Sequence, residues 1–223
     1  MDDGNRGTAL SDRGVSALLD VTEGVFPGGP PDKPRAGEAA VQDSVAAAYA
    51  AREPLLIRGG NTKAAMLRPV QAARTLSLAD HVGVTLNAPK ELVFSARAGT
   101  PVAEIEGVLA EAGQHLIAEP PDYARLLGAE AGARQTLGGV VSANLSGPRR
   151  VAWGAVRDHV LGVRAVNGTG EIIRSGGRVL KNVTGLDVCK LLTGAHGTLG
   201  VLTEITLKVL PAPAESASVV LHT

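Results

Sequence analysis

Hydrophobic positions recur at helical spacing in three stretches of the chain. Between Glu38 and Arg52 an apolar face is formed by Val41, Val45, Ala48 and Tyr49,. Residues 100–113 predict a second helix, because Thr100 can cap its start, Pro101 suits a first turn and Gly113 suits the position past its end,. Its buried stripe contains Val102, Ile105, Val108, Leu109 and Ala112,. Residues 181–194 predict a third, shorter helix with apolar Val183, Leu186, Val188, Leu191 and Leu192.

Four other stretches predict strands. Residues 54–58, PLLIR, form a short buried strand, and residues 91–99 place Leu92, Phe94, Ala96 and Ala98 on one face,. Residues 158–176 predict a hairpin around NGTG at 167–170, since such turns need positive φ,. In residues 200–213, a half-buried strand stopped by prolines, Val201, Thr203, Ile205, Leu207 and Val209 alternate with Leu202, Glu204, Thr206 and Lys208,. The mixed order without a regular βαβ repeat predicts an α+β fold.

The two ends of the chain are expected to lie outside its folded domain. Residues 1–36 are expected to be a poorly ordered segment, because PGGPPDKPR at 27–35 can continue neither a helix nor a central strand,. One domain is expected over residues 37–213, followed by a tail over residues 214–223.

Composition narrows the class of protein. Lys plus Arg equals Asp plus Glu at 22 each, so the charge gives no broad attraction to nucleic acid or anionic lipid,. Apolar runs are shorter than the ~20 residues of a membrane span, and no signal peptide is visible at the N-terminus. The single cysteine, Cys189, excludes an internal disulfide, and a buried position is favoured for it,. We expect a cytoplasmic protein without a nucleic-acid partner or a membrane span.

Glycine is abundant, with 28 residues, and it gathers with polar residues in three clusters. The first is RGGNTK at residues 58–63, directly after a predicted strand. Consecutive glycines there can direct backbone N–H groups towards an anion such as phosphate, and Lys63 can add a charge,. The alternative is a hairpin turn carrying solvated polar residues, which this stretch alone favours about two to one.

The second cluster is TLGGVVSANLSGPRR at residues 136–150. Gly138 and Gly139 can stand at a helix start whose N–H groups favour a phosphate, although a small-residue helix packed on a sheet needs the same residues,. The third is GAHGTLGVLTEITLK at residues 194–208, where backbone at 201–203 can meet a ligand. No acid–base pair, nucleophile or metal-ligand spacing accompanies these clusters, so no metal site is predicted and the catalytic residues are unknown. His196 receives no role.

The content and order of the three clusters resemble the FAD-binding domain of the vanillyl-alcohol oxidase / p-cresol methylhydroxylase (PCMH) superfamily. The resemblance implies two small α+β subdomains, residues 37–118 and 119–213, with FAD between them. It also implies non-covalent FAD, because Asn61 stands where covalent members usually carry histidine. The cofactor-binding residues carried over are Arg58, Gly59, Gly60, Asn61, Thr62, Lys63, Pro120, Thr136, Leu137, Gly138, Gly139, Ser142, Asn144, Gly147, Arg149, Gly200, Val201 and Leu202.

The segments LSGPRR, VRDHVLGVRAVNG and GGRVLKNVTGLDVCKLLTGAHGTLGVLTEITLKVLPAP are similar to the smaller FAD-binding subunits of bacterial glycolate oxidases. This resemblance implies oxidation of a 2-hydroxy acid, a larger flavoprotein subunit and an iron–sulfur subunit as partners, and membrane association, if any, through them. In the superfamily a cap domain follows the FAD domain, and we expect it to be lacking here. Two alternatives stay open: a shortened FAD domain that acts as a non-catalytic assembly module, and a self-contained FAD oxidoreductase, which a missing cap disfavours.

Overall fold

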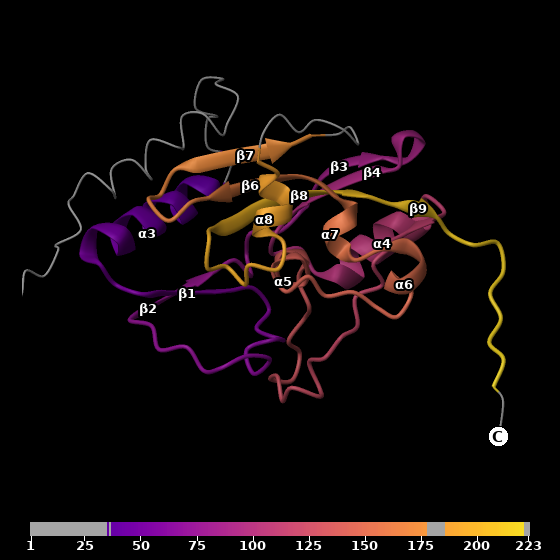
Figure 1. Ribbon diagram of the computed structural model, residues 1–223, viewed down its shortest axis with the longest axis horizontal. Helices are drawn as coiled ribbons and strands as arrows, with labels where there is room; N and C mark the ends of the chain where they lie inside the picture. Colours follow the sequence, from indigo (N-terminus) through magenta and orange to yellow (C-terminus); the bar gives the residue numbers. More distant parts are fainter. Residues whose placement is uncertain (1–34, 36, 178–185, 221–223) are drawn as a thin grey trace, which may run out of the picture.

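The computed structural model describes residue 35 and residues 37–177 and 186–220, and its main feature is a five-stranded antiparallel sheet (Figure 1). The strand order is β3-β4-β8-β6-β7. The strands span Val84–Ala88 (β3), Val93–Arg97 (β4), Val160–Val166 (β6), Ile172–Gly176 (β7) and Val201–Lys208 (β8). The predicted α+β class is confirmed. The expected N-terminal segment lies outside the described residues except for Arg35.

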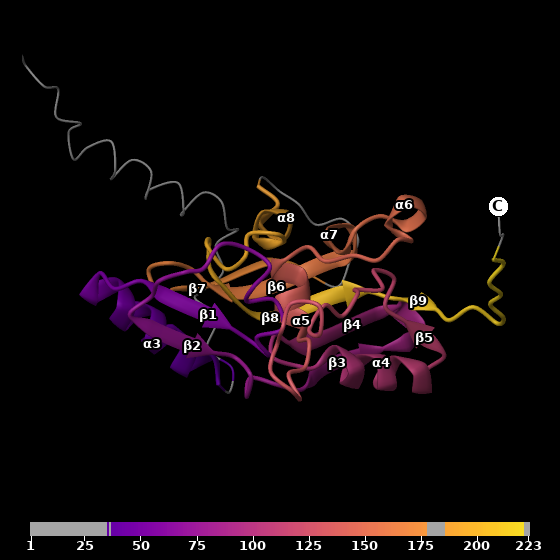
Figure 2. The ribbon, with the colours of Figure 1, turned by 90° about the horizontal axis from the view of Figure 1, so that it is seen from below.

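Helices cover the strands from two sides. Figure 2 shows α3 and α4 on one side of the molecule and α6, α7 and α8 on the other, with the strands between them. The division expected between residues 118 and 119 stays a prediction, and the five-stranded sheet takes strands from both sides of it. The helices span Glu38–Ala51 (α3), Val102–Glu111 (α4), Leu137–Ser142 (α5), Arg150–Trp153 (α6), Val156–His159 (α7) and Val188–Leu192 (α8), with a 3₁₀ turn at Pro89–Glu91.

Two small sheets complete the described fold. Strand β1 (Leu55–Arg58) pairs in parallel with β2 (Arg74–Ser77), and β5 (Gln114–His115) pairs with β9 (Leu210–Pro211). The strand predicted at 54–58 is therefore confirmed, but it is only half-buried. The sequence pattern did not predict its partner β2, because the four residues of β2 are mostly exposed and too few to show a period,.

The helices predicted at 38–52 and 100–113 are confirmed, with two corrections. Tyr49 is 59% exposed and does not belong to the buried face of α3. Thr100 does not cap α4; Pro101 holds the N-cap position, and Thr100 Oγ1 instead accepts the Gly83 N–H at 3.0 Å. Gly113 follows the end of α4 with a φ of 64°, as expected.

The third predicted helix is shorter than its apolar pattern. It begins at Val188, because the Asp187 carboxylate accepts the Lys190 N–H at 3.1 Å and caps the first turn,. Leu186 and Leu191 are about half exposed, so they are not part of its buried face. Residues 186, 187, 193 and 194 are described and are not helical, whereas residues 181–185, including Val183, lie outside the described residues.

The predicted strands at 91–99, 158–176 and 200–213 are confirmed, although their details differ. Leu92 lies outside β4 with a φ of 56°, and β4 is buried on both faces rather than one. In the β6–β7 turn the positive φ falls on Gly170, while Asn167 Oδ1 accepts the N–H groups of two later turn residues. Leu202 is buried although the alternation placed it on the polar face.

A buried ion pair joins α3 to the central sheet. Glu38, at the start of α3, is 1% exposed and Arg164 on β6 is 4% exposed. Glu38 Oε2 accepts from Arg164 Nη2 at 2.7 Å, and Glu38 Oε1 accepts from the hydroxyl of Thr203 on β8 at 2.7 Å. Since buried charges need such partners, this network fixes where α3 meets β6 and β8.

Acidification should remove this stabilisation. Burial raises the pKa of Glu38, but the hydrogen bonds from Arg164, Thr203 and the Arg35 N–H lower it more, so the pKa lies below its ordinary value. Because the pKa is lower in the folded chain, the stabilisation is complete above the unfolded pKa and is lost as pH falls through the folded pKa. In urea unfolding at about pH 7, we expect a lower free energy of unfolding for Glu38→Gln than for the wild type. Between about pH 7 and about pH 3.5, the free energy of unfolding of the wild type should fall by more than that of Glu38→Gln. Equal losses in both proteins would contradict this role of Glu38.

Candidate functional site

The three glycine clusters meet at one cleft of about 390 Å³. Its walls are the segment after β1, the helix α5 with its N-cap, and the loop that enters β8. Most of the residues predicted for the cofactor line it: Arg58, Gly59, Gly60, Asn61, Thr62, Lys63, Thr136, Gly138, Gly139, Ser142, Gly200, Val201 and Leu202. Segments that are far apart in the sequence therefore form one concave surface.

The glycines allow backbone segments to approach more closely than side chains would permit. A Cβ added at Gly60 would stand 1.8 Å from the Arg134 carbonyl oxygen, and one added at Gly59 would stand 2.4 Å from Thr136 Oγ1. At Gly138 the added Cβ would be 2.8 Å from the Cβ of Ala98. Gly138 is thus the small residue that packs α5 against the sheet, as the alternative interpretation of this cluster proposed.

Residues 59–63 form a loop with unused backbone donors. None of their backbone N–H groups donates a hydrogen bond to an acceptor in the described part of the chain. Asn61 adopts a φ of 57°, in the left-handed region, so consecutive N–H groups do not follow a strand ladder,. The alternative of a hairpin turn is wrong, because β1 and β2 run parallel. The arrangement suits an anion, which such concave runs of N–H groups bind.

The Lys63 side chain extends from this loop to Gln135, which precedes the N-cap residue of α5. Its Nζ donates to Gln135 Oε1 at 2.7 Å and lies 3.2 Å from Thr62 Oγ1. Burial lowers the pKa of Lys63 to about 8, against the attraction of Asp122, which raises it. The cleft therefore holds a partly desolvated cation beside unused N–H donors.

The start of α5 gives the cleft space but no free N–H donors. The expectation that the N–H groups of Gly138 and Gly139 favour a phosphate is therefore corrected. The Gly138 N–H donates to the Ala98 carbonyl at 2.7 Å, and the Gly139 N–H donates to Thr136 Oγ1 at 3.4 Å. These groups are therefore not available to a phosphate in the described conformation. Gly139 nevertheless faces the cleft, since a Cβ there would stand 3.8 Å from Lys63 Nζ.

Five predicted residues do not line the cleft, and their contact with a cofactor stays a prediction. Leu137 is buried in the core, the Pro120 carbonyl accepts from Gln135 Nε2, and the Gly147 N–H donates to the Ala118 carbonyl. The other two are held by neighbours: Asn144 Oδ1 accepts the Arg157 N–H, and Arg149 pairs with Glu119 at 3.2 Å over the ring of Trp153.

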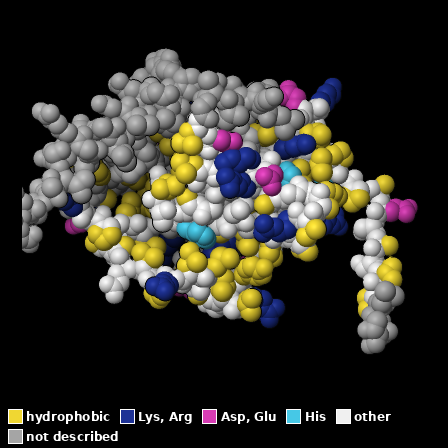
Figure 3. Space-filling model, viewed as in Figure 1, with side chains coloured by type: hydrophobic (Ala, Val, Ile, Leu, Met, Phe, Trp, Pro, Cys, Tyr) yellow, Lys and Arg dark blue, Asp and Glu magenta, His cyan; other side chains and the backbone are white. Residues whose placement is uncertain are grey.

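Several residues that line the cleft were not predicted from the sequence. The segment after Lys63 gives the cleft an apolar wall that contains Met66, Leu67, Pro69 and Val70. Leu67 and Val70 are 58% and 65% exposed, and apolar side chains gather along the lower edge of the face drawn in Figure 3 with Lys and Arg side chains between them. His196, left without a role, also lines the cleft, and its backbone adopts a φ of 51°. An apolar run without helical or strand period was the available signal for this wall.

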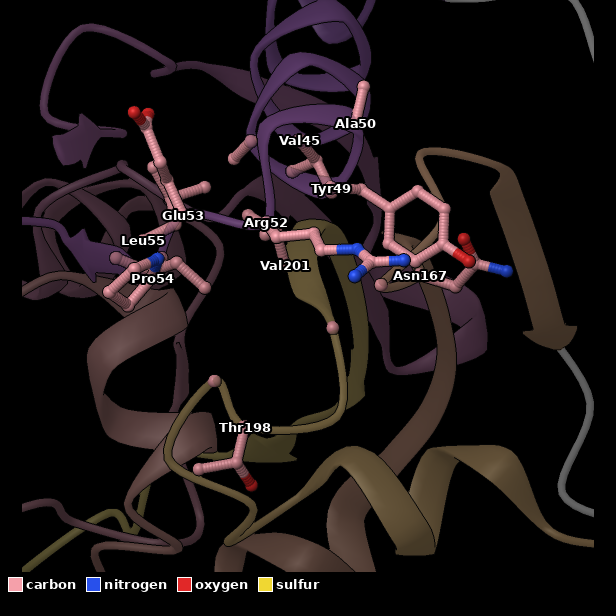
Figure 4. Close-up of a pocket in the computed structure, with 15 residues that line it drawn as sticks. Val45, Tyr49, Ala50, Arg52, Glu53, Pro54, Leu55, Asn167, Thr198 and Val201 are labelled. Carbon is pink, nitrogen blue, oxygen red and sulfur yellow. The ribbon is translucent and has the colours of Figure 1, made fainter. Parts of the chain in front are cut away.

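A second hollow of about 750 Å³ adjoins the cleft (Figure 4). It lies between the end of α3, the β6–β7 turn and the loop before β8, and it shares Ile57, Gly197, Gly200 and Val201 with the cleft. In Figure 4 the side chains of Tyr49 and Arg52 extend towards Asn167. The two hollows together give an elongated concave surface.

The described residues give little support for a metal site, a membrane-spanning helix or a reactive cysteine. They contain no group of three His, Cys, Asp or Glu that could hold a metal ion. None of the described helices combines the length and apolar character needed to cross a membrane. Cys189 is buried, as expected, and burial raises the pKa of its thiol, so it is not an activated nucleophile,.

Comparison with known proteins gives consistent matches. The family described as FAD binding domain matches residues 36–176. Glycolate oxidase subunit GlcE of Escherichia coli is 46% identical over 179 residues, which are 80% of this chain and 49% of that protein. An uncharacterized FAD-linked oxidoreductase of Mycobacterium tuberculosis is 32% identical over 86% of this chain and 41% of its own length. The chain therefore spans about half, or less, of the length of these relatives.

The fold itself matches solved structures. An alkyldihydroxyacetonephosphate synthase chain superimposes with a TM-score of 0.61 at 22% identity, covering 78% of this chain and 30% of that chain. At this identity the match concerns the fold alone. It is the mixed α+β arrangement expected from the sequence.

Proposed function

Because the chain belongs to the FAD-binding domain family, we propose that its cleft binds FAD non-covalently and that the chain is the flavoprotein subunit of a glycolate (2-hydroxy acid) oxidase or dehydrogenase complex. The observation that carries the proposal is the loop of residues 59–63: its residues line the cleft, and their backbone N–H groups donate to no acceptor in the described part of the chain. The 46% identity to a glycolate oxidase subunit supports the complex.

The residues of the cleft fit FAD. Backbone N–H groups of residues 59–63 and the Lys63 ammonium would hold the diphosphate, and the glycines leave the space that a Cβ would fill,. The apolar wall of Met66, Leu67 and Val70 would contact apolar parts of the cofactor and exclude water,. Bound FAD would supply a redox centre that exchanges electrons with the partner subunits. Asn61 offers an amide, which forms no covalent flavin link.

The chemistry of the substrate is assigned to partners: a larger flavoprotein subunit that dehydrogenates the 2-hydroxy acid and an iron–sulfur subunit that carries electrons onward. The complex would be cytoplasmic, with membrane contact only through those partners. Support comes from the similarity to a glycolate oxidase subunit and from the cleft, whose walls carry no acid–base pair among the described residues. The second candidate, an assembly module without flavin, would keep the fold and lose the cofactor.

Purification of the chain expressed alone separates these functions. We expect a yellow protein, or one that takes up added FAD, and release of all its flavin by acid precipitation because the cofactor is held by contacts only. A colourless protein that takes up no FAD would favour the assembly module. Reduction of dyes with glycolate by the chain alone would contradict the dependence on partners.

Gly139→Val tests the cleft itself. The added side chain would enter the space beside Lys63 Nζ, so we expect flavin occupancy to fall while the fold is retained. Gly107→Val in α4 makes the same change in a helix where an added Cβ meets nothing within 4 Å, and it should leave occupancy unchanged. Absorbance of released flavin per chain measures both variants. Unchanged occupancy in folded Gly139→Val would exclude this cleft as the FAD site.

A further inference from the structure

Gln135 is a buried amide that bridges two loops beside the cleft. It is 6% exposed, and both polar atoms of its side chain are used: Oε1 accepts from Lys63 Nζ at 2.7 Å, and Nε2 donates to the Pro120 carbonyl at 3.3 Å. Its backbone carbonyl accepts the Val102 N–H at 2.8 Å, at the start of α4. Gln135 is therefore fixed from both sides, and it can hold a mobile lysine side chain in one place.

The Lys63 ammonium keeps a donor for a ligand. A protonated lysine carries three N–H donors, and the contacts with Gln135 and Thr62 use two of them. No carboxylate forms an ion pair with Nζ among the described residues; Asp122 attracts it only from farther away. A Cβ on Gly139 would stand 3.8 Å from Nζ, which places Nζ between the loop of residues 59–63 and α5.

We propose that Gln135 is a positioning residue: it holds the Lys63 ammonium beside the loop of residues 59–63, where Lys63 binds the diphosphate of FAD. The inference rests on the proposed function, since it concerns how the same cleft holds its cofactor. The proposal adds to the FAD site a residue outside the glycine clusters. It also predicts that the affinity of the chain for FAD depends on pH.

The direction of the pH dependence follows from burial. Burial lowers the pKa of Lys63 to about 8 in the chain without ligand, so part of the population is neutral in mildly alkaline solution. A diphosphate beside Nζ favours the charged form and raises the pKa. The affinity for FAD should therefore fall as pH rises through about 8 and level off above the pKa of the bound state.

Other charged groups near the cleft must be separated from this effect. Arg58, Arg68 and His196 line it, and Asp122 acts on Lys63 from the loop after Pro120. The Lys63→Met variant retains all of these groups. Any pH dependence that comes from the flavin itself is also the same in this variant as in the wild type. The difference between wild type and Lys63→Met isolates the Lys63 proton.

The experiment titrates FAD with the flavin-free chain and follows flavin fluorescence from about pH 7 to about pH 9. For the wild type we expect affinity to fall roughly tenfold over this range, with proton uptake in calorimetry in buffers of different ionisation enthalpy. Lys63→Met should bind about 10- to 100-fold more weakly at neutral pH and lose the extra pH dependence. Lys63→Arg should restore affinity without that dependence, because arginine stays charged.

Gln135 has its own pair of variants. Gln135→Met removes the amide and should weaken binding about 2- to 10-fold while keeping the pH dependence. Gln135→Glu should pair with Lys63 in the free protein, so FAD would bind more weakly and without proton uptake. Thermal unfolding without flavin checks that each variant is folded.

The outcomes distinguish the two proposals. A Lys63→Met variant that binds FAD as tightly as wild type, with the same pH dependence, would overturn the inference and leave the proposed function intact. A Gln135→Glu variant with the wild-type affinity and pH profile would overturn the part assigned to Gln135. A wild-type chain that takes up no FAD at any pH would overturn the proposed function and the inference with it.

Discussion

Replacement of Arg164 with alanine is expected to lower the free energy of unfolding by about 3–5 kcal/mol. The reason is the Glu38 carboxylate, which is 1% exposed and would remain buried without its guanidinium partner. The start of α3 would then separate from β6, or Glu38 would take up a proton. Urea denaturation at neutral pH, followed by circular dichroism, measures the loss.

Two variants make this test specific. Arg35→Ala removes an ion pair with Glu204 in which the Arg35 side chain is 52% exposed, and it should cost no more than about 1 kcal/mol,. The double variant Glu38→Leu with Arg164→Met replaces the pair with apolar side chains and should recover much of the loss. A loss in Arg164→Ala no larger than that in Arg35→Ala would show that the buried pair does not stabilise the fold.

Replacement of Gly60 with alanine is expected to abolish flavin binding. The added Cβ would lie 1.8 Å from the Arg134 carbonyl oxygen and 2.9 Å from its carbonyl carbon. Both are backbone atoms, so the loop of residues 59–63 must move away from the segment before α5. Overpacking of this kind costs about 1–3 kcal/mol of stability, and it would displace the N–H groups to which we assign the diphosphate in the proposed FAD site. Flavin absorbance per chain and thermal unfolding measure the two effects.

The matched control is Gly107→Ala in α4, where an added Cβ meets nothing within 4 Å. It should bind flavin like the wild type and unfold no earlier, because alanine favours a helix more than glycine does. Full flavin occupancy in Gly60→Ala would mean that the close approach of the two backbone segments is not needed for the site.

Long elements with a clear period could be predicted from the sequence. The helix α4 and the strand β8 keep their apolar residues at regular spacing over many residues, and the β6–β7 turn contains Gly170 where its conformation needs a positive φ. Short elements could not be predicted: β2 has four residues, and its pairing with β1 depends on a parallel neighbour that no local pattern specifies. The cap of α4 was misassigned because Thr100 finds its partner in Gly83, a contact made by folding.

The sequence by itself determined the α+β class and the membership of a family of FAD-binding domains, and it located the glycine clusters, because periodicity and glycine spacing are local properties. Only the tertiary structure decided what each cluster contributes to the site. It assigned the unused N–H donors to residues 59–63, showed that those of Gly138 and Gly139 already have acceptors, and placed Gln135 against Lys63. Hydrogen bonds are exclusive and join residues far apart in the chain, so which donors remain for a ligand is known only after the backbone has folded.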